Sequence, residues 1–202
     1  MSHLPPTIES HATSVLALNI ESISLNDDQF AQLCLDNRDL RLELTSKGEL
    51  IIMPPTGSKT GLRSAIIIQR LANWAERNRR GLAFDSSTGF TLPDGSKRSP
   101  DASWVRRERW DALSKEQQDG FAPIAPDFLI ELLSPSDSWN LLQQKMLDYL
   151  DNGVRLAWLI DPEQRRVYIY RPDQPVEILE NPATVSADSL LPGFDLDLQE
   201  IY

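Results

Sequence analysis

Two carboxylates and one lysine stand at positions of this chain where an ordinary core would hold apolar side chains. The run 128–133 is typical of a central strand that is apolar on both faces, yet Glu131 lies in its middle. Asp101 begins a second short strand, and Lys145 falls within the apolar stripe of a helix predicted over 138–152. Because a buried charge is costly unless it is paired or holds a metal, these three side chains together predict a site.

The chemistry of that site depends on whether the strands that carry the two acids are neighbours. If they are, Asp101 and Glu131 converge, and carboxylates within about 4–6 Å of each other require a proton or a cation between them. The helix follows Glu131 after a short corner, so Lys145 is expected to point toward the sheet. An ammonium group there can orient a metal-bound water or stabilise charge that develops on a phosphate.

Each residue alone also has a structural explanation. Glu131 can be a structural acid paired with Arg41 or Arg155, Lys145 can extend along the sheet edge with its amino group in water, and Asp101 can be a strand-start acid.

Glu43 is the weakest candidate. It shares a polar strand face with Arg41 and Thr45, so simple exposure to solvent explains it.

Composition indicates one globular domain without a membrane span. The chain has 202 residues, of which 41% are hydrophobic and 25% charged. No apolar run approaches the ~18 residues that cross a bilayer, and residues 1–13 lack the pattern of a secretory signal. The single cysteine, Cys34, excludes an intrachain disulfide, so a reducing cytoplasm is expected.

Histidine usage narrows the chemistry further. The two histidines, His3 and His11, both lie in the N-terminal arm, so a Ser-His-Asp or Cys-His mechanism lacks a base. A hydrolase that used Ser134 or Ser136 would have no base other than Lys145. A metal would therefore be held by oxygen ligands, which favours Mg²⁺ or Mn²⁺ over zinc.

The net charge is acidic, with a formal value of −10 at pH 7 and a pI near 4.7. This counts against a protein that simply coats nucleic acid, whose binding face is normally basic. A local basic groove stays open, although a solvated helix end or loop explains each basic cluster alone. The clusters are Arg77, Arg79 and Arg80; Lys97 and Arg98; and Arg106, Arg107 and Arg109.

The order of predicted elements indicates a mixed sheet with helices on its faces, an α/β or α+β domain. After an arm over 1–25, the chain reads as a helix ending at Asp36, a hairpin, and a long helix over 58–80 that Gly81 ends. Short strands, a small helix or loop over 106–118, the central strand, the helix of Lys145 and further strands follow. Ser136 or Asp137 is expected to cap the helix of Lys145.

Five ordered blocks resemble the Uma-two (Uma2) family of putative restriction endonucleases, which is placed in the PD-(D/E)xK nuclease superfamily. The resemblance extends over about residues 25–200 and is most specific from about 100 to 162. The blocks are Pro100-Asp101; Glu131-Leu132-Leu133-Ser134-Pro135-Ser136-Asp137; Lys145 with Tyr149; Asn152-Gly153-Val154; and Trp158-Leu159-Ile160-Asp161-Pro162.

The resemblance implies a restriction-endonuclease-like domain over 26–202 and a Mg²⁺-dependent site. Asp101 and Glu131 would hold the metal, with the backbone carbonyl of Leu132 as a further ligand. The superfamily usually places its lysine two residues after the second acid, where this chain has a leucine. The Uma-two pattern has the lysine on the following helix, where Lys145 matches. Glu43 would match the early acid of the hairpin. Tyr149 would either contact the phosphate or, as we favour, simply pack against its neighbours.

The function implied is metal-assisted hydrolysis of DNA by an endonuclease. A homodimer is expected, because two symmetric sites most simply cut both strands of a duplex. The alternative is a catalytically inactive module that binds nucleic acid or protein and retains the nuclease fold, which the acidic pI supports.

Overall fold

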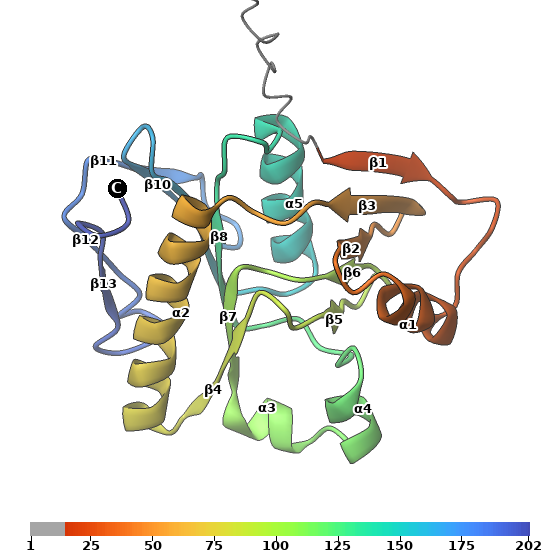
Figure 1. Cartoon of the computed structure of the whole chain (residues 1–202). Coiled ribbons are helices and arrows are strands. Elements are labelled where there is room, and N and C mark those ends of the chain that lie inside the picture. Colours follow the sequence, from red (N-terminus) through yellow and green to blue (C-terminus); the bar gives the residue numbers. More distant parts are fainter. Residues whose placement is uncertain (1–14) are drawn as a thin grey trace, which may run out of the picture.

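A mixed six-stranded sheet forms the centre of the computed structural model, which describes residues 15–202 (Figure 1). The strands β8 (Phe128–Leu132) and β9 (Leu156–Asp161) run parallel, and the other pairs are antiparallel. In spatial order the strands are β11 (Glu177–Glu180), β10 (Arg166–Tyr170), β9 (Leu156–Asp161), β8 (Phe128–Leu132), β7 (Ala102–Arg106) and β4 (Gly81–Asp85). This mixed sheet confirms the predicted fold class.

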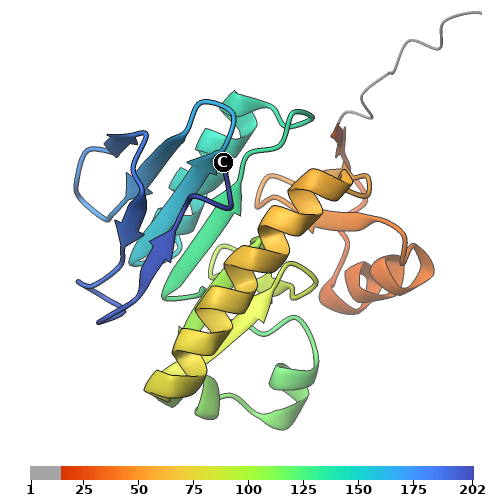
Figure 2. The same cartoon turned by 60° about the vertical axis from the view of Figure 1, so that its left-hand side comes forward.

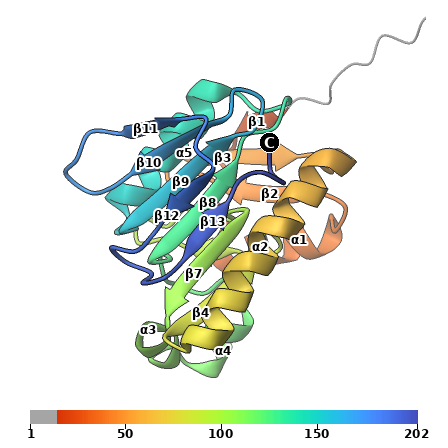
Figure 3. The same ribbon diagram turned by 90° about the vertical axis from the view of Figure 1, so that its left-hand side faces the viewer.

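The central strands β8 and β9 are buried along their whole length, as their continuous apolar sequences predict. The helix α5 (Trp139–Asp151) connects them, because parallel neighbours need a crossover rather than a hairpin. This helix packs on one face of the sheet, while α2 (Ser58–Asn78) crosses the other face (Figures 2 and 3).

Alternation along β8 divides its side chains between those two faces. Phe128 and Ile130 belong to the core under α2, which also contains Ile67 and Leu71 of that helix. Leu129 lies in the core under α5. Glu131 is two residues further along, so it faces α5 as well.

A second sheet of five strands lies beside the first. It contains the predicted hairpin of β2 (Arg41–Leu44) and β3 (Glu49–Met53). The strand β6 (Lys97–Arg98) pairs with β2 through Lys97 and Leu44. The remaining members are β1 (Leu16–Asn19), β5 (Phe90–Thr91) and β6 (Lys97–Arg98), in the order β1-β3-β2-β6-β5.

The strand β1 lies within residues 1–25, for which the sequence predicts an arm. Residues 16–19 pair with residues 49–52 of β3 and so belong to the sheet. Residues 1–14, with His3 and His11, lie outside the described part of the chain. The domain boundary at 25/26 stays a prediction.

Three short helices and a two-stranded sheet complete the described part of the chain. The predicted helix α1 (Asp27–Asp36) starts at Asn26, whose side chain accepts from the Gln29 N–H in a capping box. The segment 106–118, expected to be a small helix or loop, contains α3 (Arg107–Asp111) and all but the last residue of α4 (Lys115–Asp119). The strands β12 (Thr184–Ser186) and β13 (Asp195–Asp197) pair with each other.

Two helix boundaries differ from those predicted. Arg79, at φ 59°, ends α2 in the left-handed conformation expected of Gly81. Gly81 begins β4 instead, where a Cβ would lie 2.3 Å from the Val105 carbonyl oxygen. Ser138, without a side-chain capping bond, precedes α5 in place of Ser136 or Asp137. The Asp137 carboxylate instead accepts from the Ser134 N–H at 2.8 Å, within the corner that precedes α5.

Among residues 15–202, no helix combines the length and apolar character needed to cross a bilayer.

Candidate active site

The structure brings Glu131 and Lys145 together on the face of the sheet that α5 covers. The Lys145 Nζ lies 2.7 Å from the Glu131 Oε1, and the Tyr149 hydroxyl donates to the same oxygen at 2.9 Å. Only 11% of the Lys145 side chain is exposed, so its amino group does not extend into water as the structural explanation had required. The Tyr149 ring packs in the core under α5, as favoured from the sequence, and its hydroxyl also holds the Glu131 carboxylate in place.

Asp101 directly precedes β7, and its side chain lies beside the carboxyl end of the neighbouring strand β8. Its Oδ2 accepts from the backbone N–H of Leu132 at 2.9 Å, and its Oδ1 pairs with Arg41 at 3.1 Å. The two acid-bearing strands are therefore neighbours, as the site requires. Arg41, considered as a partner of Glu131, pairs with Asp101 instead.

Exposure does not explain Glu43, which corrects the sequence analysis. Only 1% of Glu43 is exposed. Its Oε1 accepts from Lys145 Nζ at 2.9 Å and from the Ser99 N–H at 3.0 Å, and its Oε2 pairs with Arg98 at 3.2 Å. Strand alternation correctly gave β2 a polar face, but that face is covered by groups from β6 and α5. Lys145 thus bridges Glu43 and Glu131.

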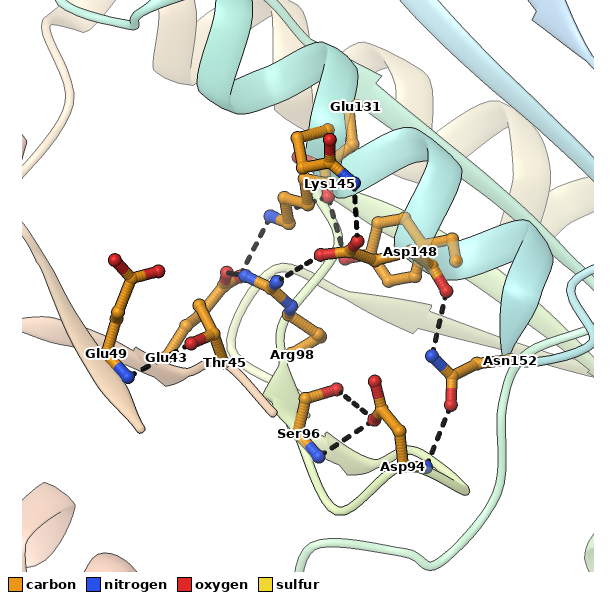
Figure 4. Close-up of polar contacts among 12 residues, drawn as sticks. Glu43, Thr45, Glu49, Asp94, Ser96, Arg98, Glu131, Lys145, Asp148 and Asn152 are labelled. Carbon is orange, nitrogen blue, oxygen red and sulfur yellow. Dashed lines mark hydrogen bonds and ion pairs between the residues drawn. The ribbon is translucent and has the colours of Figure 1, made fainter. Parts of the chain in front are cut away.

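Arg98 is a site residue that sequence reasoning missed. Its guanidinium joins Glu43 to Asp148, with the Asp148 Oδ2 at 2.9 Å (Figure 4). Asp148 on α5 is 29% exposed at its side chain and belongs to this network. The only signal in the sequence was the basic pair Lys97-Arg98 close to Asp101.

The charges around Glu43 stabilise its ionised form. Burial would raise the pKa of Glu43, but Lys145 and Arg98 outweigh it and lower that pKa to about 2. Burial likewise opposes the charged form of Lys145, yet Glu131 and Glu43 raise its pKa above the ordinary value. Lys145 therefore stays an ammonium at neutral pH.

Glu131 behaves differently because the cost of burying its charge outweighs the attraction of Lys145. Burial is the largest cause that raises the pKa of Glu131, Lys145 opposes it, and Asp101 and Glu43 add to the rise, so that the pKa is about 7. Burial also raises the pKa of Tyr149 well above its usual value, so the phenol stays protonated and donates to Glu131. One more cation near Glu131 would favour its ionised form.

The network forms part of the wall of a cavity of about 470 Å³ between the two sheets. Both acids, Glu43, Arg98 and Lys145 line it. The first turns of α2 contribute further lining at Thr60, Gly61 and Ser64, and the corner before α5 contributes Ser134 and Ser136. A substrate in this cavity would meet the charged side chains directly.

The donor set fits a hard divalent cation. Among residues 15–202, no group of three or more His, Cys, Asp and Glu side chains is arranged to hold a metal ion. Mg²⁺ needs fewer protein ligands, since it is usually bound by one or two carboxylates and keeps several waters. Asp101 and Glu131 supply two carboxylates that line the same cavity, and such an ion would favour the ionised form of Glu131.

Comparison with known families identifies the chain. The model of the Uma2 family, described as "Putative restriction endonuclease", matches residues 27–199. The chain belongs to the Uma2 family. The Uma2 assignment made from the five sequence blocks is thereby confirmed.

A solved structure agrees with the Uma2 assignment. A putative nuclease belonging to DUF820 from Anabaena variabilis ATCC 29413 is 26% identical, with a TM-score of 0.73 over 88% of this chain and 97% of that chain. The DrdV–DNA complex has a TM-score of 0.40 and 16% identity over 62% of this chain and 10% of that one. No curated protein matched the sequence. Family and fold together support a nuclease-like function.

Proposed function

We propose that this Uma2 protein is a metal-dependent endonuclease that hydrolyses phosphodiester bonds of DNA. The observation that carries the proposal is the position of Lys145. Its ammonium is held between Glu43 and Glu131, on the wall of a cavity that Asp101 also lines. A buried lysine shared by two carboxylates is poorly explained by packing alone, because burying three charges costs free energy that an apolar cluster would not.

The carboxylates of Asp101 and Glu131, with the backbone carbonyl of Leu132, would hold Mg²⁺ or Mn²⁺. A bound divalent ion lowers the pKa of water and polarises the phosphate. The Leu132 N–H and Arg41 orient Asp101, while Tyr149 and Lys145 hold the Oε1 of Glu131.

Lys145 would orient the attacking water and donate to phosphate oxygens as negative charge develops. Glu43 keeps that ammonium in place and charged, and Arg98 keeps Glu43 ionised. In this proposal Glu43, which the resemblance matches to the early acid of the hairpin, therefore positions the Lys145 ammonium. Lys145 stands on α5 rather than two residues after Glu131, but its amino group reaches the same carboxylate.

A homodimer and a cytoplasmic location belong to the same proposal and stay predictions. Two symmetric sites would cut both strands of a duplex. Sedimentation at equilibrium should then give about twice the chain mass of 22.8 kDa.

Plasmid nicking tests the activity. Purified protein should convert supercoiled DNA to nicked and linear forms with Mg²⁺ or Mn²⁺, and Lys145→Ala should slow this at least ~100-fold. Lys115→Ala, which removes an exposed lysine on α4, is the matched control and should cleave as the native protein does. Circular dichroism should report a folded protein in both variants.

Two outcomes would count against the proposal. Equal nicking by Lys145→Ala would point to a contaminating nuclease. A melting temperature that Mn²⁺ leaves unchanged would favour an inactive module that binds nucleic acid or protein, because an ion that binds the folded state stabilises it by mass action. A metal-induced shift that Asp101→Asn abolishes would support the metal site instead.

A further inference from the structure

Two arginine-rich segments that are separate in sequence meet at the C-terminal end of α2. The N–H of Arg107 donates to the carbonyl oxygen of Arg80 at 2.8 Å. Gly81 pairs with Arg106 across β4 and β7. The end of α2, the start of β4 and the start of α3 therefore lie together, away from the cavity end of α2 (Figure 1).

Four arginines of these segments are exposed and incompletely neutralised, although the chain as a whole carries a net charge of −10. Arg77, Arg79 and Arg80 are exposed, and no carboxylate lies within ion-pair distance of them among residues 15–202. Arg107 is exposed as well and forms only a 3.8 Å pair with Asp111 on its own helix. Such exposed pairs contribute little to stability and leave an arginine available to a ligand.

Arg109 and Arg106 differ from this group. Arg109 pairs at 2.9 Å with the buried carboxylate of Asp127, and Arg106 pairs with Glu108 at 3.4 Å. We define the arginine patch as the four remaining residues, Arg77, Arg79, Arg80 and Arg107.

Local stability accounts for only part of this arrangement. A cation at the C-terminus of a helix interacts favourably with the helix dipole, which explains one arginine there. Arg79, however, adopts φ 59°, a conformation that favours glycine or asparagine. Arg79 and Arg107 also line one shallow hollow, together with Glu76 and Gly81. Two arginines from different elements therefore border the same depression.

We infer that the arginine patch binds the phosphate backbone of duplex DNA. The inference rests on the proposed function for the identity of the polymer, and on charge complementarity for the contact itself. The first turns of α2 line the cavity and its C-terminus carries the patch. A helix of 21 residues is about 30 Å long. At 3.4 Å per base pair that length is about nine base pairs of DNA. The patch would hold the duplex about one helical turn from the bond that is cut.

Equilibrium binding tests the patch without cleavage. The affinity for a fluorescent 20-base-pair duplex would be measured by anisotropy, in chelator and over a range of salt concentrations. Arg79→Asn with Arg107→Ser should weaken binding at least fivefold and make the slope of log K against log salt shallower by about two, since each lost phosphate contact removes about 0.9. Asparagine at 79 suits the left-handed backbone.

The matched control removes two exposed arginines elsewhere. Arg38→Ser with Arg165→Asn produces the same net charge, and Arg165 also has positive φ, at 52°. This variant should bind within twofold of the native protein with an unchanged slope. In nicking assays the patch variant should raise KM and leave kcat unaltered, because the patch lies outside the catalytic machinery.

The outcomes separate this inference from the proposed function. Equal loss in the patch and control variants would mean that net charge alone governs binding, and would overturn the inference. Native protein that does not bind the duplex, or patch variants that bind as well as native, would overturn it too. Patch-dependent binding without any metal-dependent nicking would support the patch and remove only the nuclease proposal.

Discussion

The charges of this site form an alternating chain in which each cation is shared by two carboxylates. Arg98 joins Asp148 to Glu43, and Lys145 joins Glu43 to Glu131. Because each shared group has two partners, no charge in the chain is left buried and alone. Glu131, at the inner end of the chain, is the member whose ionised form is least favoured.

Glu131→Gln should stabilise the metal-free protein at alkaline pH. Between the ordinary value of 4.5 and about 7, the folded protein retains a proton on Glu131 that the unfolded chain has released. Stability therefore falls as pH rises through this window. Glutamine cannot ionise, so the variant should gain about 1–3 kcal/mol at pH 8 and change little at pH 5.

Urea unfolding in chelator at the two pH values measures this effect. A variant that is less stable than native at pH 8 would mean that attraction between Lys145 and Glu131 exceeds the cost of burying the carboxylate. The same substitution should abolish nicking and the Mn²⁺-induced rise in melting temperature, since it removes a metal ligand of the proposed site.

At the scale of elements, the position of each site residue is set by how closely its strand or helix approaches the next. The strand β4 lies against β7 because Gly81 has no side chain, and α2 must end before it. The left-handed turn at Arg79 follows from this arrangement, because the helix must stop within a few residues of the strand. The same turn exposes the arginine patch.

Gly81→Ala should destabilise the protein by about 2–4 kcal/mol. The added Cβ would lie 2.3 Å from the Val105 carbonyl oxygen and 2.4 Å from the Trp104 ring, so backbone and core must move. Gly57→Ala is the matched control, because a Cβ there meets nothing within 4 Å and its φ of −67° suits any residue. Chemical denaturation should show that the control loses less than about 1 kcal/mol of its free energy of unfolding. Similar losses for both would refute the role of close approach.

At the scale of the molecule, the site depends on two sheets that have separate cores. Glu43 and Arg41 come from the five-stranded sheet, whereas Glu131 comes from the six-stranded one. The smaller core consists of Phe30, Leu42 and Leu50 with partly buried neighbours, and the Phe30 and Phe121 rings pack edge to face with their centroids 5.4 Å apart. Loosening that core would withdraw Glu43 from Lys145 without disturbing Glu131.

Phe30→Ala should cost about 3–5 kcal/mol and increase hydrogen exchange first in β2 and β3. Nicking should then fail at temperatures below global unfolding. Phe194→Ala, in the core of the six-stranded sheet, is the matched control and should instead increase exchange in β8 and β9. Uniform exchange changes in both variants would indicate one cooperative unit and contradict this separation.

Local periodicity determined most of the elements and part of the site. The capping box at Asn26, the hairpin, the buried strand of Glu131 and the helix of Lys145 are encoded by residues close in sequence. Alternation placed Glu131 on one face of its strand, and the helical stripe directed Lys145 toward that face. Their contact at 2.7 Å follows from the short corner between them.

Only the tertiary structure decided which polar residues are buried. Glu43 meets Arg98 and Lys145 across 55 and 102 positions of the chain, and no local pattern records what will cover a polar strand face. The meeting of the arginine segments at Arg80 and Arg107 depends likewise on the pairing of β4 with β7. Periodicity fixes the direction of a side chain relative to its own backbone, whereas its partners depend on long-range packing.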